Sequence, residues 1–138
     1  MNIIVLAGGL SPERDVSLTS GASICKALNE KGHNAYLLDV YLGLEYDKTK
    51  LEEVFTLPSK GLEIAKGIST TPPNLAEVKA LRKGDSTAAF GPNVLELCLM
   101  ADITFLALHG SIGENGKIQA TFDLLGIKYT GPNSFACA

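Results

Sequence analysis

Several patterns that would assign a common chemistry at once are missing from this sequence. There is no G-x-G-x-x-G after the first predicted strand, no G-x-x-x-x-G-K-[ST] and no G-x-S-x-G. These absences exclude a dinucleotide-binding fingerprint, a P-loop and the nucleophile elbow of a serine hydrolase. The two histidines, His33 and His109, lie far apart, and no Cys-x-x-Cys or Cys/His spacing occurs. We therefore predict no metal site.

An excess of positive charge and long apolar runs are missing as well. Lys and Arg number 12 against 15 Asp and Glu, a formal net charge of −3, so we expect no nucleic-acid partner and no membrane partner. The start, MNIIVLAGG, has no basic leader, and its apolar run is too short for a signal sequence or a membrane span. The three cysteines, Cys25, Cys98 and Cys137, are expected to be buried thiols of a reducing compartment. A cytoplasmic protein is the expectation.

The sequence does contain short apolar segments that alternate with amphipathic ones, in 138 residues that are 46 % hydrophobic. This length and composition fit one packed domain, residues 1–138. We expect strands at 2–7, 34–41, 102–109 and 127–130, and helices at 15–31, 92–101 and 116–126. The alternation predicts an α/β fold with an open, Rossmann-like, parallel four-stranded sheet in the order 2-1-3-4 and helices on both faces.

Residues 43–90 interrupt the alternation, and we interpret them as a variable surface insertion or a lid between two core strands. Within them, EEVFTL and LEIAKGI flank PSKG and suggest a hairpin, whereas NLAEVKAL suggests one or two helical turns. The helix at 15–31 is expected to bury an apolar stripe. The stripe consists of Val16, Ala22, Cys25, Ala27 and Leu28.

Two glycine-containing loops, GGLSPERDVS and HGSIGENG, follow the first and third predicted strands. In the order 2-1-3-4 these strands are neighbours, and ligands bind beyond the carboxyl ends of such strands. Glu13 either complements the positive end of the following helix or holds a cationic group such as an ammonium. His109 either bridges core and solvent or hydrogen-bonds a ligand and transfers a proton.

Taken together, the two loops resemble those of the amino-terminal domain of D-alanine–D-alanine ligases, which are ATP-grasp enzymes. The family's first motif, G-G-x-S-x-E-[RH]-x-[VI]-S, matches Gly8 to Ser17, and its second, H-G-x-x-G-E-[DN]-G-x-[hydrophobic]-Q-[small], matches His109 to Ala120. The segment LLGIKYTGPNSFACA is similar to the family's LLGIPYTGS…ASA. The likeness covers residues 1–41 and 92–138, and the part between them is where such ligases vary.

The resemblance implies an ATP-dependent ligation that makes a dipeptide for peptidoglycan. ATP phosphorylates the carboxylate of one D-alanine, and the amine of a second D-alanine attacks the acyl phosphate. Glu13 then corresponds to the residue that holds the ammonium of the first D-alanine, and His109 to one that orients substrate and assists proton transfer. Val16 and Ser17 match residues that line or order the same subsite. Arg14 and Asp15 are expected to support the loop.

The resemblance also implies that the central and ATP-grasp domains, which bind ATP and Mg²⁺, lie outside residues 1–138. We therefore expect no cofactor in this chain and no ligation by this chain alone. Ligases of this kind are commonly homodimers. The alternatives are a ligase that joins D-alanine to D-lactate or D-serine, a different ATP-grasp ligase, and a non-catalytic α/β interaction module.

Overall fold

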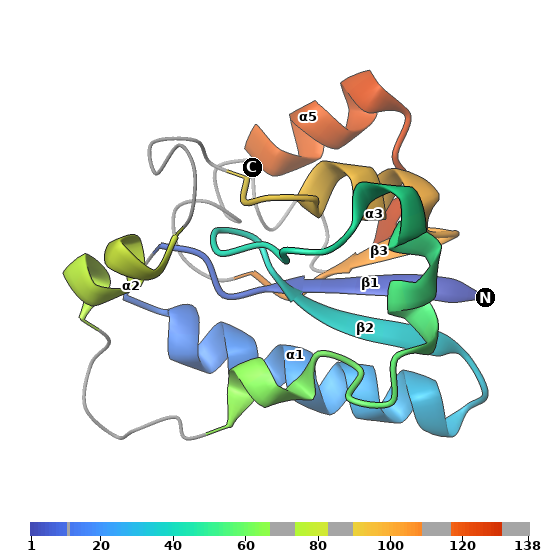
Figure 1. Ribbon diagram of the computed structural model, residues 1–138, viewed down its shortest axis with the longest axis horizontal. Coiled ribbons are helices and arrows are strands. Elements are labelled where there is room, and N and C mark those ends of the chain that lie inside the picture. The colour runs from blue at the N-terminus through green and yellow to red at the C-terminus, as the bar shows by residue number, and fades with distance from the viewer. Residues whose placement is uncertain (11, 67–73, 83–89, 109–116, 131–138) are drawn as a thin grey trace.

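Parallel strands form the centre of the structure, a computed structural model that describes residues 1–10, 12–66, 74–82, 90–108 and 117–130 (Figure 1). The strands are β1 (Asn2–Ala7), β2 (Asn34–Asp39), β3 (Ile103–Leu106) and β4 (Tyr129–Thr130). The α-helices are α1 (Arg14–Glu30), α2 (Leu75–Leu81), α3 (Val94–Met100) and α5 (Lys117–Leu125). Two 3₁₀ segments, η1 (Lys48–Thr56) and η2 (Leu62–Ala65), follow β2.

The sheet has the order β2-β1-β3-β4 with all pairs parallel, which confirms the predicted α/β fold and strand order. β1 lies in the interior of the sheet, where Leu6 is opposite Leu38 of β2 and Leu106 of β3. A strand with neighbours on both edges and helices on both faces has no polar side, which explains why β1 reads as an unbroken apolar run.

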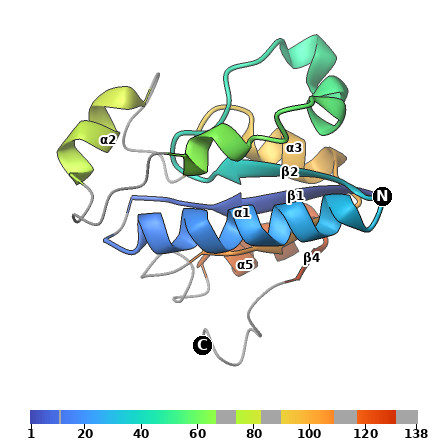
Figure 2. The same cartoon turned by 90° about the horizontal axis from the view of Figure 1, so that it is seen from below.

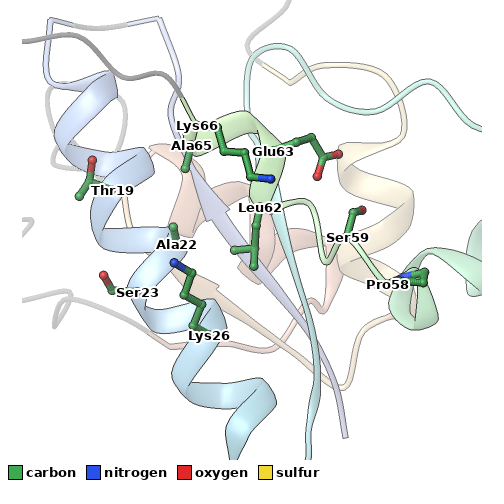
Figure 3. Close-up of a pocket in the computed structure, with 10 residues that line it drawn as sticks. All are labelled: Thr19, Ala22, Ser23, Lys26, Pro58, Ser59, Leu62, Glu63, Ala65 and Lys66. Atoms are coloured by element: carbon green, nitrogen blue, oxygen red, sulfur yellow. The ribbon is translucent and has the colours of Figure 1, made fainter.

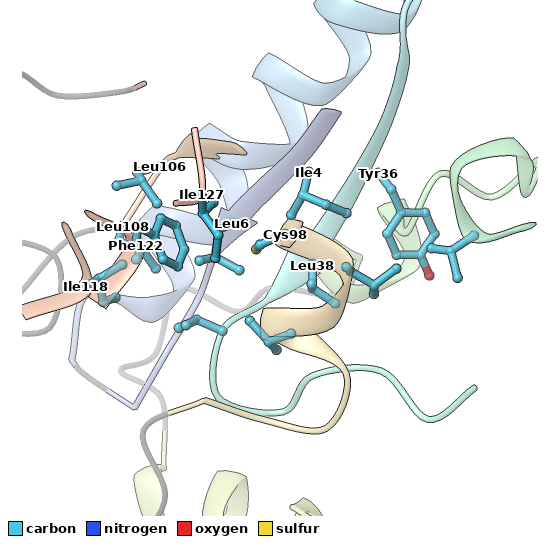
Figure 4. Packing of buried hydrophobic residues seen from close by; sticks show 14 of the residues in the cluster. Ile4, Leu6, Tyr36, Leu38, Cys98, Leu106, Leu108, Ile118, Phe122 and Ile127 are labelled. Atoms are coloured by element: carbon cyan, nitrogen blue, oxygen red, sulfur yellow. The ribbon is translucent and has the colours of Figure 1, made fainter. Parts of the chain in front are cut away.

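Side chains of β1 alternate between two hydrophobic cores, one on each face of the sheet. Ile4 and Leu6 face the core that α3, α5 and η1 cover (Figure 4), whereas Ile3 and Val5 face the core that α1 covers. Figure 1 shows α1 on one side of the sheet and α3 and α5 on the other, and Figure 2 shows α1 in front of the strands. The prediction of helices on both faces is therefore confirmed.

The buried face of α1 differs from the expected apolar stripe. Val16 is 58 % exposed and Ala27 is also exposed. Cys25 of the expected stripe is buried, and Ala22 and Leu28 are half-buried against the core. The other buried positions are Arg14, Ser17, Leu18 and Gly21. The physical reason is close packing, because a Cβ at Gly21 would come within 2.9 Å of both the Ala7 Cβ and the Leu37 Cδ1. A small residue and hydrogen-bonded polar residues, rather than hydrophobicity alone, decide which face meets the sheet.

The hairpin expected inside 43–90 is wrong, because both of its arms are helical. In η1 the buried residues Leu51, Val54 and Phe55 recur at three- and four-residue spacing and join the core beside α3. The helix expected from NLAEVKAL is confirmed as α2, whose N-cap Asn74 side chain accepts hydrogen bonds from the backbone N–H groups of Ala76 and Glu77.

The two ends of the 43–90 segment lie side by side. The Leu44 N–H donates to the Pro92 carbonyl at 2.9 Å, and the Gly91 N–H donates to the Val40 carbonyl at 2.8 Å. A Cβ at Gly43 would lie 2.4 Å from the Pro92 carbonyl oxygen, so glycine is required for this backbone approach. The segment therefore leaves the sheet and returns to it at one point.

Several predicted elements are slightly longer than the observed ones. β2 ends at Asp39 rather than at residue 41, and β3 ends at Leu106 rather than at residue 109. α3 begins only at Val94, after Asn93 with a φ of 64°, so Pro92 precedes its first turn. The predicted helix at 116–126 is observed as α5, and Gly126 follows it with a φ of 74°.

Candidate active site at the carboxyl ends of β1 and β3

The structure brings the chain after β1 beside the chain after β3. The Ala107 N–H donates to the Leu6 carbonyl at 2.8 Å, so pairing continues to the ends of both strands. The turn after β1 contains Gly8 and Gly9, with φ values of 76° and 89°, a region that glycine adopts without steric cost. His109 and the rest of HGSIGENG lie outside the described residues.

Ser17 ties these two strand ends together. Its Oγ accepts a hydrogen bond from the Gly8 N–H at 2.9 Å and donates to the Ala107 carbonyl at 2.6 Å. The side chain is fully buried, so its hydroxyl makes its hydrogen bonds within the protein and does not face solvent. This placement suits the ordering role that the motif implies for Ser17, rather than the lining role.

The side chains of Glu13 and Val16, in contrast, face solvent. Glu13 immediately precedes α1 and its side chain is exposed, while its carbonyl accepts the Ser17 N–H at 3.0 Å. Val16 is 58 % exposed. Both side chains are therefore accessible to solvent, and their role in binding substrate stays a prediction.

Beneath Glu13 lies a buried ion pair between Arg14 and Asp39. An Arg14 Nη2 to Asp39 Oδ2 distance of 2.5 Å defines the pair, and the Arg14 Nη1 donates to the Gly9 carbonyl at 2.8 Å. The expectation that Arg14 supports the loop is thus confirmed. Sequence reasoning missed Asp39, although a carboxylate that ends an apolar strand next to the first strand is a usable signal.

A groove separates the outer surface of α1 from η2 (Figure 3). It has a volume of about 490 Å³, and Lys26 of α1 and Lys66 after η2 stand on its opposite walls. Glu63 and the hydroxyls of Thr19 and Ser23 also line it. The groove contains none of the predicted site residues, and it is separate from the Gly8–Gly9 turn.

The cysteines that the structure describes are buried and unpaired. Burial raises the pKa of the Cys25 thiol to about 11 and that of the Cys98 thiol to about 12, so neither is a thiolate near neutral pH. This agrees with the predicted structural role of these two, and Cys137 lies outside the described residues.

Within the described ranges, no three His, Cys, Asp or Glu side chains gather as metal ligands would. No helix in the same part of the chain has the length and apolar character to span a membrane.

Comparison with known proteins agrees with the motifs. The family described as "D-ala D-ala ligase N-terminus" matches residues 2–132. The chain belongs to this family. The D-alanine–D-alanine ligase of Lacticaseibacillus casei is 48 % identical over 138 residues, which are 99 % of this chain and 38 % of the relative. The corresponding ligase of Pediococcus pentosaceus is 46 % identical over 139 residues, again 99 % of this chain and 38 % of the relative.

The chain therefore spans less than half the length of these relatives. Among solved structures, the VanG D-Ala:D-Ser ligase of Enterococcus faecalis is similar with a TM-score of 0.51 at 22 % identity, over 99 % of this chain and 37 % of that chain. That likeness concerns the fold alone. The domain groups exposed Glu13 and Val16 above buried Arg14 and Ser17.

Proposed function

We propose that this chain is the substrate-side domain of an ATP-dependent D-alanine–D-alanine ligase. The observation that carries the proposal is the place of Glu13, which is exposed at the carboxyl edge of the sheet on a turn fastened to β2 and β3. In parallel sheets this edge is where ligands bind. Family membership supports the same assignment.

Glu13 is the residue proposed to hold the ammonium of the first D-alanine. A carboxylate that receives an ammonium forms a charge-assisted hydrogen bond, which is stronger than a neutral one. Val16, one helical turn further on and exposed, lines the same subsite, and Ser17 orders the turn from below. His109 is proposed to orient the substrate and to assist proton transfer from the loop after β3. In this proposal, the contribution of the domain to the reaction is positioning.

The remaining parts of the reaction are assigned to chain beyond residue 138. The curated relatives are longer, since this chain covers 38 % of the Lacticaseibacillus casei ligase. We propose that a central domain and an ATP-grasp domain bind ATP and Mg²⁺ there, that residues 1–138 form the N-terminal domain with 43–90 as its variable insertion, and that the 138-residue chain alone makes no dipeptide. The reading frame after Ala138 tests the first point, and dipeptide formation by the isolated chain would overturn the last.

The test of the function uses the full-length protein with ATP, Mg²⁺ and D-alanine, with D-alanyl-D-alanine measured by mass spectrometry. Glu13→Gln removes the charge that meets the ammonium and is expected to raise the half-saturating D-alanine concentration by about 10- to 100-fold, the equivalent of roughly 1.5–3 kcal/mol. Glu96→Gln is the matched control, because Glu96 is likewise an exposed glutamate near the start of a helix.

Two results would contradict the proposal: no dipeptide from the wild-type protein, or an unchanged D-alanine dependence in Glu13→Gln. Competition among D-alanine, D-lactate and D-serine as acceptors decides between the dipeptide ligase and its depsipeptide or D-serine variants. The structural likeness to a D-Ala:D-Ser ligase does not discriminate between them, because it reports the fold.

A cytoplasmic location and a homodimer belong to the same proposal. The buried free thiols of Cys25 and Cys98 support a reducing compartment. Leu99 at 53 % exposure and Leu124 at 89 % exposure, on the two helices that cover one face, supply apolar surface for contact between copies. Light scattering of the full-length protein measures the oligomeric state.

A further inference from the structure

Two residues adjacent in the sequence, Glu13 and Arg14, have opposite environments. The Glu13 side chain is exposed, whereas Arg14 is only 7 % exposed. Arginine is seldom buried to this extent without a partner. At the start of α1, the backbone therefore directs the Arg14 cation into the protein and the Glu13 carboxylate toward solvent.

The Arg14 guanidinium joins three segments with two different nitrogens. Nη2 meets the Asp39 carboxylate at the end of β2, and Nη1 donates to the Gly9 carbonyl in the turn after β1. Arg14 itself begins α1. The planar fork of arginine makes such contacts in a fixed mutual direction, which the single ammonium of lysine does not do.

Both oxygens of the Asp39 carboxylate accept hydrogen bonds from groups of the protein itself. Its Oδ1 accepts from the backbone N–H groups of Gly9 at 3.3 Å, Tyr41 at 2.9 Å and Leu42 at 3.2 Å, and the residue is 2 % exposed. A Cβ at Gly8 would lie 2.9 Å from this carboxylate. Asp39 thus holds both the turn and Arg14 without reaching solvent, so neither member of the pair contacts a bound substrate.

Stability alone is a weak explanation for this pair. Transfer of two charges from water to the interior is costly, and apolar side chains of similar volume often stabilise a protein as well or better. What apolar side chains cannot supply is directed contact with both the carbonyl and the N–H of Gly9, which Arg14 and Asp39 provide. The contribution of the Arg14–Asp39 pair is therefore to fix the position of the Gly9 backbone.

We propose that Arg14 and Asp39 are positioning residues that fix the Gly8–Gly9 turn and the direction of Glu13, and so set the affinity for the first D-alanine. This inference rests on the proposed function. It makes substrate affinity depend on an ion pair that the substrate does not touch.

The test compares Arg14→Gln/Asp39→Asn with Lys48→Gln/Glu96→Gln in the full-length protein. The first double variant replaces the buried pair by neutral amides, and the shorter Gln cannot reach Gly9 and residue 39 together. The second neutralises an exposed pair, Lys48 Nζ to Glu96 Oε2 at 3.7 Å, with side chains 72 % and 49 % exposed. We expect the half-saturating D-alanine concentration to rise about tenfold in the first only, with kcat within about twofold and the ATP dependence unchanged.

Arg14→Lys decides the matter if the double variant does not fold. It keeps the positive charge but lacks the fork, so we expect a thermal midpoint near that of the wild type with a raised half-saturating D-alanine concentration. A folded variant with wild-type D-alanine dependence would overturn the proposal, since a purely structural role changes the thermal midpoint and leaves the substrate dependence alone.

Hydrogen–deuterium exchange supplies a measurement that does not depend on ligase activity. In Arg14→Lys, the amide of Gly9 is expected to exchange faster than in the wild type, because its acceptor, the Asp39 carboxylate, is no longer held in place by the guanidinium. Unchanged exchange there would overturn the positioning role. If the wild-type protein makes no dipeptide, the proposed function fails, and this exchange result alone decides whether the pair fixes the turn.

Discussion

At the scale of single residues, the glycine turn after β1 is held by side chains that come from elsewhere in the chain. Gly8 donates to Ser17, and Gly9 contacts both Arg14 and Asp39, so the partners come from α1 and from the end of β2. A buried N–H or carbonyl without a partner costs free energy, so these contacts both satisfy the turn and define its shape. The turn is consequently sensitive to single-atom changes.

Gly8→Ala tests this sensitivity through the stability of the 138-residue chain in urea. The added Cβ meets the Asp39 carboxylate at 2.9 Å on a backbone with a φ of 76°. We expect a loss of roughly 1–3 kcal/mol in the free energy of unfolding. Gly32→Ala is the matched control, because it has a φ of 92° but no heavy atom within 4 Å of the new Cβ. Equal losses in the two variants would show that backbone strain, not contact with Asp39, is responsible.

At the scale of elements, α1 approaches the sheet closely because Gly21 faces β1 and β2. The missing Cβ leaves room for Ala7 and Leu37, which an alanine would meet at 2.9 Å. Close approach brings Ser17 and Arg14 within reach of the strand ends, so helix packing and site geometry share one cause.

Gly21→Ala separates packing from helix propensity. Alanine favours a helix over glycine by about 1 kcal/mol, yet we expect this substitution to lower the free energy of unfolding by about 1–3 kcal/mol because the core is overpacked. Ser23→Ala, at an exposed position of the same helix, is the control and is expected to be neutral or slightly stabilising. Stabilisation by Gly21→Ala in urea would mean that α1 has room to move outward.

At the scale of the whole molecule, two cores share one sheet, and each contains a buried thiol. Cys25 lies in the core beside α1 and Cys98 in the core beside α3. Burial raises the pKa of both thiols from an ordinary value of 9.0, to about 11 for Cys25 and about 12 for Cys98. Above pH 9 the unfolded chain therefore loses these protons first, and the folded state becomes less stable as the pH rises.

We accordingly expect alkaline conditions to destabilise the chain through these thiols. Between pH 8 and pH 10, the free energy of unfolding should fall by about 1 kcal/mol less in Cys98→Ala than in the wild type, because one thiol no longer ionises preferentially on unfolding. Urea titrations at the two pH values measure the difference. Ser23→Ala, which removes an exposed hydroxyl and no thiol, should keep the wild-type slope. An identical slope in Cys98→Ala would contradict the expectation.

Local patterns predicted those features that depend on neighbouring residues in the sequence. The continuous apolar run of β1 and the two glycine-containing motifs lead to the strand order and to the family. The buried face of α1 was predicted only in part, because Gly21 and Arg14 owe their burial to contacts with β1 and β2. Asp39 was missed although the predicted strand order places β2 beside β1, because its pairing with Arg14 depends on how deeply the start of α1 is buried. The helical arms around PSKG were mistaken for strands because short apolar segments fit either element.

The contact of Gly43 with Pro92, and of Val40 with Gly91, bears on how the domain tolerates a change in the length of the chain between them. Backbone hydrogen bonds join the two ends of this segment, so the ends stay together whatever the length of the chain between them. Lengthening such a loop costs little free energy. We therefore expect a change of chain length after η2 to leave β2 and α3 in place, whereas the Lys60 carbonyl and η2 are already fastened to β2 and to the core beside α1. The arrangement of Glu13, Ser17 and the strand ends is then independent of the chain length after η2.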